Sequence, residues 1–208
     1  MLQNRVDPCG NIIKTNARGY WMGNRGILHD DEQNIIRPFK LKAWLICKLE
    51  FNGRKRQVMS PHRYTELFFL DEATAFAAGH RPCFECRRQD FNRFRFFFLK
   101  GNVAFGFTEK TSISEIDALM HHQRIDSRRA KITFEESAEN IPEGTFILFD
   151  EKPYIFLKNR IFAWSPFGYE KSEAMPKVKK FTVLTPLSIV NTLRAGYKTQ
   201  IAIKLNSY

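Results

Sequence analysis

The sequence predicts an α+β protein, with strands and short helices in its amino-terminal part and a small antiparallel sheet or partial barrel in its carboxyl-terminal part. Residues 41–100 alternate short β-prone runs with helical patterns, whereas residues 142–186 are short apolar runs broken by Gly, Pro, Asn or Asp. The chain has 208 residues, of which 43% are hydrophobic and 26% charged, as in globular proteins. A large core is therefore expected, and the 20 Phe residues should fill much of it.

The amino-terminal elements begin after a region rich in turn-forming residues. Residues 1–40 abound in Gly, Asn and Asp, and the stretch RGYWMGNRG within them is predicted as loop. Residues 41–51 read as a strand, followed by the turn NGRKR and a second strand that starts near Gln57. Residues 63–70 are predicted as a further strand.

Three helices are expected in the middle of the chain. Asp71 suits an N-cap and Gly79 suits the left-handed residue that ends a helix, so a short helix should lie between them. A second helix is predicted over 86–100, with Phe residues on its apolar face. A third is predicted over 111–125, capped by Ser112 or Ser114.

The carboxyl-terminal part is predicted to pair short strands and to close them with a helix. The strand candidates end at a helix over 186–196, which Gly196 would terminate. A soft boundary near residue 110 divides the chain into parts 1–110 and 111–208, which could share one core. The strand candidates are 142–150, 152–159, 160–169 and 179–186.

The charge of the chain favours a polyanionic partner. The formal net charge is +11, and residues 1–100 hold 18 Lys and Arg against 10 Asp and Glu. Such a field attracts polyanions, of which nucleic acid is the commonest, although a basic protein can also simply be soluble. No apolar run reaches the roughly 18 residues of a membrane span, and the start does not resemble a signal peptide. We therefore expect a cytoplasmic protein that does not bind membranes.

The four cysteines point to metal chemistry. In a reducing compartment a disulfide framework is not expected, which leaves a metal site, a redox pair or coincidence to explain the Cys-x-x-Cys of Cys83 and Cys86. A redox pair usually opens a helix directly after a strand, whereas here Gly79 and Arg81-Pro82 lead into the pair as a turn. A turn is what a tetrahedral Zn²⁺ knuckle needs, and such a site requires two further ligands.

The stretch FFLDEATAFAAGHRPCFECRR resembles the second half of the metal-binding domain of Ada-type DNA-repair proteins. That half has an aromatic strand, a short Ala-rich helix, and then Ala-Gly-aromatic-Arg-Pro-Cys-x-x-Cys before basic residues. The resemblance covers residues 68–88 of the 208, and it implies that Cys83 and Cys86 are zinc ligands beside a surface that meets DNA. The matching positions are Phe68, Phe69, Glu72, Ala73, Ala77, Ala78, Gly79, Arg81, Pro82, Cys83 and Cys86.

The chain departs from that family upstream of the knuckle. The family pattern has a Cys-x3-Cys pair there, one thiolate of which accepts a methyl group, whereas this chain has only Cys47. Methyl transfer is therefore not expected. We predict Cys47 as the third ligand and His29 as the fourth, chosen over Cys9, His62 and His80. His80 replaces the aromatic residue of the family pattern and reads as a packing residue.

Two further features allow an enzyme, although the sequence does not decide whether the protein is one. The Gly-rich loop 18–29 carries Arg18, Asn24, Arg25 and His29 and could line a pocket or be a structural turn. On the third helix, Asp117, His121 and Arg124 share one face. They could form an acid–base site, or only a solvated polar stripe.

Three functions follow as hypotheses. The first is a zinc-containing nucleic-acid-binding protein that binds DNA rather than RNA and has a repair or DNA-processing role. The second is a nucleic-acid-processing enzyme (a glycosylase, a nuclease or a lesion-reversal enzyme), with its pocket between the 18–29 loop and the third helix. The third is a metal-stabilised scaffold for another protein. In the first, phosphates would be contacted by Arg54, Lys55, Arg56, Arg81, Arg87, Arg88, Arg93 and Arg95.

Overall fold

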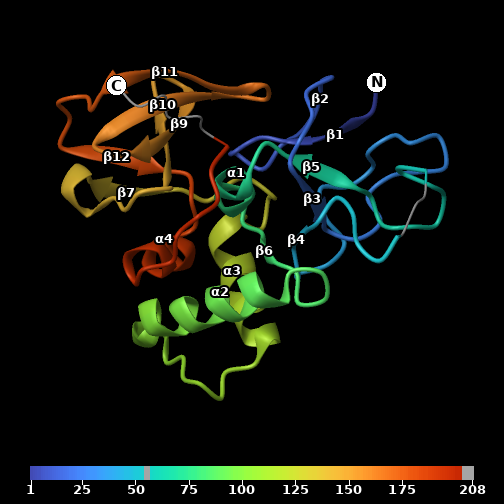
Figure 1. Cartoon of the computed structure of the whole chain (residues 1–208), viewed down its shortest axis with the longest axis horizontal. Coiled ribbons are helices and arrows are strands. Elements are labelled where there is room, and N and C mark those ends of the chain that lie inside the picture. Colours follow the sequence, from blue (N-terminus) through green and yellow to red (C-terminus); the bar gives the residue numbers. More distant parts are fainter. Residues whose placement is uncertain (54–56, 203–208) are drawn as a thin grey trace.

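The computed structural model describes residues 1–53 and 57–202, and within them it is an α+β fold with two six-stranded sheets and four α-helices. The sheets lie on opposite sides of the molecule, with α1 (Glu72–Ala77) between them and the longer helices below (Figure 1). None of the helices in this described part has the length and apolar character needed to cross a membrane.

The first sheet is built from the amino-terminal part of the chain. Its strand order is β2-β1-β5-β3-β4-β6, with β1 parallel to β5, β4 parallel to β6, and the other neighbours antiparallel. The strands are β1 (Gln3–Val6), β2 (Ile12–Lys14), β3 (Trp21–Asn24), β4 (Leu45–Cys47), β5 (Leu67–Phe69) and β6 (Arg81–Pro82).

The sequence-based expectation for this sheet was partly wrong. Strand β3 lies in the stretch predicted as loop, and β4 occupies only three residues of the predicted strand 41–51. No strand starts near Gln57, and the predicted hairpin tip Arg54, Lys55 and Arg56 lies outside the described residues. Strand β5 falls within the predicted 63–70. Long-range pairing between β3, β4 and β5 therefore decides this sheet more than local hairpins do.

The helices follow their local signals closely. Asp71 caps α1, because its carboxylate accepts from the Thr74 backbone N–H at 2.8 Å, and Gly79 follows the helix with φ +84°. A capping box of Ser112 and Glu115 starts α3 (Ile113–Arg124). Gly196 follows α4 (Leu187–Arg194) with φ +117°. The remaining helices are α2 (Arg88–Gly101) and the 3₁₀ turns η1 (Val103–Phe105) and η2 (Ala138–Asn140).

The second sheet comes from the carboxyl-terminal part and is antiparallel throughout. Its order is β11-β10-β9-β8-β12-β7, and in the described part of the chain no pairing joins β11 to β7, so the sheet is open and not a closed barrel. The strands are β7 (Phe134–Ser137), β8 (Phe146–Phe149), β9 (Lys152–Leu157), β10 (Arg160–Ser165), β11 (Gly168–Ala174) and β12 (Lys180–Val183).

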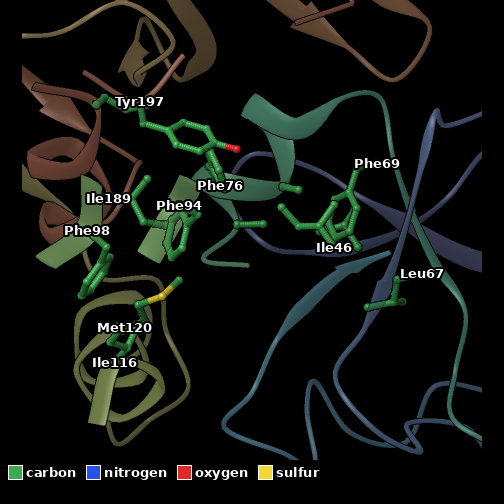
Figure 2. Packing of buried hydrophobic residues seen from close by; sticks show 14 of the residues in the cluster. Ile46, Leu67, Phe69, Phe76, Phe94, Phe98, Ile116, Met120, Ile189 and Tyr197 are labelled. Atoms are coloured by element: carbon green, nitrogen blue, oxygen red, sulfur yellow. The ribbon is translucent and has the colours of Figure 1, made fainter. Parts of the chain in front are cut away.

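One hydrophobic cluster runs across both parts of the sequence. It joins strand residues of the first sheet to residues of all four α-helices, from Val6 to Tyr197. Figure 2 shows Phe76 of α1 between the sheet residues Ile46 and Phe69 on one side and Phe94, Phe98 and Ile189 on the other. Helix α1 therefore connects the first sheet to the helical layer.

Two acidic residues at the start of α1 fasten the carboxyl-terminal segments to it. Asp71 accepts hydrogen bonds from the Tyr169 hydroxyl at 2.7 Å and from the Ala202 backbone N–H at 3.0 Å. Glu72 accepts from Arg87 at 2.6 Å and from the Tyr197 hydroxyl at 3.1 Å. Because both carboxylates are buried, these bonds form in a region that excludes water and tie distant segments together.

Candidate metal centre

Three cysteine thiols meet at one end of the first sheet. The Sγ atoms of Cys47, Cys83 and Cys86 lie within 4.8 Å of one another, and all three residues are buried. In a tetrahedral thiolate site with Zn–S bonds of about 2.3 Å, neighbouring sulfurs are roughly 3.8 Å apart. The group could therefore hold a metal ion with only small adjustments.

Backbone pairing explains how Cys47 reaches the Cys-x-x-Cys turn. Strand β4 ends at Cys47 and runs parallel to β6, which ends directly before Cys83. The Cys83 backbone N–H donates to the Ile46 carbonyl at 2.9 Å, which fixes the two chain segments side by side. The turn then closes with the Arg87 N–H donating to the Cys83 carbonyl at 3.0 Å.

The local environment favours a thiolate at this centre. The Lys48 backbone N–H donates to the Cys86 sulfur at 3.4 Å, as amides often do to metal-bound thiolates. Hydrogen bonds from the thiols of Cys47 and Cys86 lower the pKa of Cys83. The pKa of Cys47 is raised, because its thiol is hydrogen-bonded to Cys83 and Cys86. One proton is therefore lost easily, and a cation would be needed to stabilise the second and third thiolates.

The structure does not bring His29 to the thiols. Its Nδ1 is 2.5 Å from the Thr65 hydroxyl and its Nε2 is 3.3 Å from the Ser60 carbonyl oxygen, so both ring nitrogens are occupied. The physical reason is the path of the loop after β3, which turns toward Thr65. The other candidates for the fourth ligand were Cys9, His62 and His80. Among the described residues, none of these three lies in the group formed by the thiols.

A cavity lies beside the open side of the thiol group. It has a volume of about 480 Å³, and its wall includes all three cysteines together with Asn24, Lys48, Tyr64, Glu66 and Glu85. Solvent or an added ligand can therefore approach the thiols from this side. Three protein ligands and one open position are typical of catalytic zinc, and four protein ligands are typical of structural zinc.

Two of the arginines predicted to meet phosphates are instead used inside the protein. Arg81 donates from Nε and Nη2 to the two carboxylate oxygens of Asp117, each at 2.7 Å. Arg87 is 2% exposed, pairs with Glu72 and Asp90, and its guanidinium carbon lies 3.8 Å from the centre of the Trp21 ring. Neither side chain is free to reach a polyanion, because each already has a buried anionic partner.

The other predicted contacts differ in how accessible they are. Arg88 is exposed and stacks on Phe84, with its guanidinium carbon 4.0 Å from the ring centre. Arg93 is exposed but pairs with Asp90 at 3.2 Å. Arg95 is half-buried and donates to the carbonyls of Glu109 and Thr111. Arg88 is therefore the best placed of the described arginines near the thiols.

The helix face predicted as an acid–base site is arranged differently from that expectation. Asp117 is engaged by Arg81 and does not orient His121. The Nδ1 of His121 lies 2.8 Å from a guanidinium nitrogen of Arg124. Burial and the charge of Arg124 lower the pKa of His121 to about 4, so the ring is neutral and accepts this hydrogen bond. The expected acid–base site of Asp117, His121 and Arg124 is therefore not assembled, because the Asp117 carboxylate is not hydrogen-bonded to the His121 imidazole among the described contacts.

Arg124 instead belongs to a basic cluster that local motifs did not reveal. Its guanidinium and that of Arg25 each lie 3.9 Å from the ring centre of Trp44, and the Arg25 Nε–H donates to the Nε2 of His80 at 3.1 Å. His80 is therefore a fully buried acceptor in a polar contact. The sequence marked Arg25 only as a polar group of the Gly-rich loop, and no spacing linked it to Trp44.

The fold and the site together define an α+β protein with a buried three-cysteine group able to hold a metal ion. Comparisons of the chain with protein-family models, with curated proteins and with solved structures find no match. Its function is therefore argued from the residues themselves.

Proposed function

We propose that this chain is a zinc-containing nucleic-acid-binding protein that acts on DNA in a repair or processing role. The observation that carries the proposal is the meeting of the Cys47, Cys83 and Cys86 thiols. Beside them lies an exposed arginine–aromatic pair, Phe84 of the turn and Arg88 at the start of α2. Thiolate ligands favour zinc among the common divalent ions of a reducing compartment, and the cytoplasm is the proposed location.

The pair of Phe84 and Arg88 supports a nucleic-acid contact. Phe84 lies between the two cysteines of the turn and is 49% exposed, so its ring is accessible to a partner. Its ring packs edge-on against Phe91 and carries the guanidinium of Arg88 on its face. A base can stack on such a platform while the guanidinium meets a phosphate, and this combination binds single strands without reading sequence.

Metal content is the first test of the proposal. Elemental analysis of the purified protein should give about one zinc per chain, because three thiolates and one further ligand complete a tetrahedral site. Zinc should be lost from Cys47→Ser and Cys83→Ser and retained by Cys9→Ser, whose thiol lies outside the group. A wild-type protein without zinc would refute the zinc assignment.

Salt dependence of DNA binding is the second test. The binding constant of the wild type should fall steeply as salt rises, because cationic side chains release counterions from the DNA. Arg88→Gln should lower the log–log slope by about 0.7 on a single strand. Phe84→Ala should weaken binding with little change in slope. Lys180→Gln on β12 of the other sheet is the matched control and should bind like the wild type. Binding that does not depend on salt would favour the scaffold hypothesis instead.

A further inference from the structure

Another cavity lies away from the thiols and is lined by cations. It has a volume of about 590 Å³, within the range of small-molecule pockets. No Asp or Glu lines it in the described part of the chain. Its cationic lining residues are Arg25, Arg37, Arg124, Arg129 and Lys131.

Two of these cations are buried without an ion-pair partner among the residues that the structure describes. Arg25 and Arg124 are each 1% exposed, and their hydrogen bonds to other described residues go to carbonyl oxygens and to imidazole nitrogens. Within the described residues, Arg25 Nη2 and Arg124 Nε have no hydrogen-bond partner at all. Burying a guanidinium costs free energy unless an anion compensates for it, so this wall carries uncompensated positive charge.

Asp7 and Asp117 are the carboxylates whose charge acts on these cations, but their own hydrogen bonds go to other residues. Asp7 lies outside the lining and accepts from the backbone and side-chain N–H groups of Asn11, each at 2.9 Å. Asp117 holds Arg81 with both oxygens. Burial lowers the pKa of Arg25, Arg124 and Lys131 by more than the charges of Asp7 and Asp117 raise it, in keeping with incomplete compensation of these cations.

The residues that line the cavity suit a ligand that has both an apolar part and a charged part. Trp44 holds both buried guanidinium groups against its ring, which fixes their positions. Ile12, Ile35 and Phe39 add apolar wall. A rigid pair of arginines matches the oxygens of a phosphate, and a monoester carries nearly two negative charges at neutral pH.

We propose that this cavity binds a phosphate monoester, with Arg25, Arg124 and Lys131 at the anion and Arg37 and Arg129 at the mouth. The monoester could belong to a free mononucleotide or to the 5′ end of a nucleic-acid strand, and both present the same dianionic group. This inference does not depend on the proposed function, because a free phosphate ester would also fill the site.

Calorimetric titration of the full chain tests the site with three probes. They are adenosine 5′-monophosphate, a 5′-phosphorylated DNA oligonucleotide and the same oligonucleotide with a 5′-hydroxyl. Lys131→Gln keeps a donor for the Ala77 carbonyl but removes the charge, so it should weaken binding of the phosphate probes by about tenfold. The double variant Arg37→Gln/Arg129→Gln changes exposed side chains, should fold normally, and should weaken binding several-fold.

Arg128→Gln is the matched control for the mouth of the cavity. Arg128 neighbours Arg129 in the same exposed turn but does not line the cavity, so its variant should bind the probes like the wild type. Equal binding by the wild type and by both cavity variants would overturn the proposal, and so would the absence of binding by both phosphate probes.

The probes also separate this inference from the proposed function. An oligonucleotide that binds equally with a 5′-phosphate or a 5′-hydroxyl, with no binding of the mononucleotide, would overturn the phosphate site but leave nucleic-acid binding intact. Binding of the mononucleotide without binding of either oligonucleotide would support the site and count against the proposed function.

Discussion

The ion pair between Glu72 and Arg87 should be among the most costly to break. The Arg87 Nη2 lies 2.6 Å from a Glu72 carboxylate oxygen, and both side chains are fully buried. Glu72→Gln keeps the size of the side chain but removes its charge, so that among the described residues the partly exposed Asp90 is the carboxylate that remains paired with the buried guanidinium. Removing one member of a buried pair typically costs 3–5 kcal/mol, and because Asp90 remains we expect about 3 kcal/mol.

The same substitution at a surface pair provides the control. Arg194 Nη2 lies 2.5 Å from a Glu136 oxygen, but these side chains are 34% and 20% exposed. Glu136→Gln should therefore cost at most about 1 kcal/mol, because water solvates both charges when the pair is broken. The two variants share the chemistry and nearly the same N–O distance, so burial is the main difference between them.

Urea denaturation measures both free energies. For a chain of this size, a loss of about 3 kcal/mol should also lower Tm by roughly 6–12 °C. The slope of the unfolding free energy against urea should stay unchanged, which would show that the folded state remains compact. Equal losses in Glu72→Gln and Glu136→Gln would refute the reasoning that burial sets the cost.

Three more outcomes are expected from the same structure. His121 is neutral in the fold, with a pKa of about 4 against about 6.5 when unfolded, so the unfolded state binds more protons between these values. Stability should therefore fall as pH drops from about 6.5 to about 4, and His121→Gln should lose less over this window than the wild type in urea titrations at each pH. Gly101→Ala would place a Cβ 2.3 Å from the Asn191 carbonyl oxygen between α2 and α4 and should cost about 1–3 kcal/mol, whereas Lys100→Ala at the exposed neighbouring position should cost well under 1 kcal/mol in the same denaturation assay. Tyr169→Phe removes the donor to Asp71 and should cost about 1–2 kcal/mol by thermal or urea unfolding, and a variant as stable as the wild type would show that this bond contributes nothing.

The sequence predicted the helices well because their signals are local. The Asp71 cap, the Ser112 capping box and the glycines after α1 and α4 each act within a few residues of the helix end. Strand β3 was missed because its residues, Trp-Met-Gly-Asn, resemble a turn. Gly23 sits in β3 because a Cβ there would lie 2.4 Å from the ring of Phe69 on the paired strand β5. A requirement set by a residue so distant in sequence leaves no local pattern.

The candidate metal site also combines residues that local sequence patterns predict with residues whose position depends on long-range pairing. Cys83 and Cys86 follow from their spacing, and Cys47, inside the predicted strand 41–51, was predicted as the third ligand because it stands alone where the family pattern has an upstream pair of cysteines. Its meeting with the pair depends on the parallel pairing of β4 with β6, which the sequence did not indicate. His29 was chosen for its flexible loop, yet the loop carries it to Thr65. A side chain on a loop has many possible neighbours, whereas one at a strand end has few.

The number of basic residues overstates how many are available to a partner. Arg81 and Arg87 are among the 18 Lys and Arg of residues 1–100, but each is paired with a buried carboxylate and is not free to contact a polyanion. Arg25 and Arg124 are also buried, and no carboxylate of residues 1–53 or 57–202 is hydrogen-bonded to them, which concentrates positive charge at one cavity wall. Since the fold keeps this costly arrangement and fixes it on Trp44, the wall should gain stability from any dianion that fills the cavity. Phosphate esters should therefore raise the Tm of the wild type more than that of Lys131→Gln.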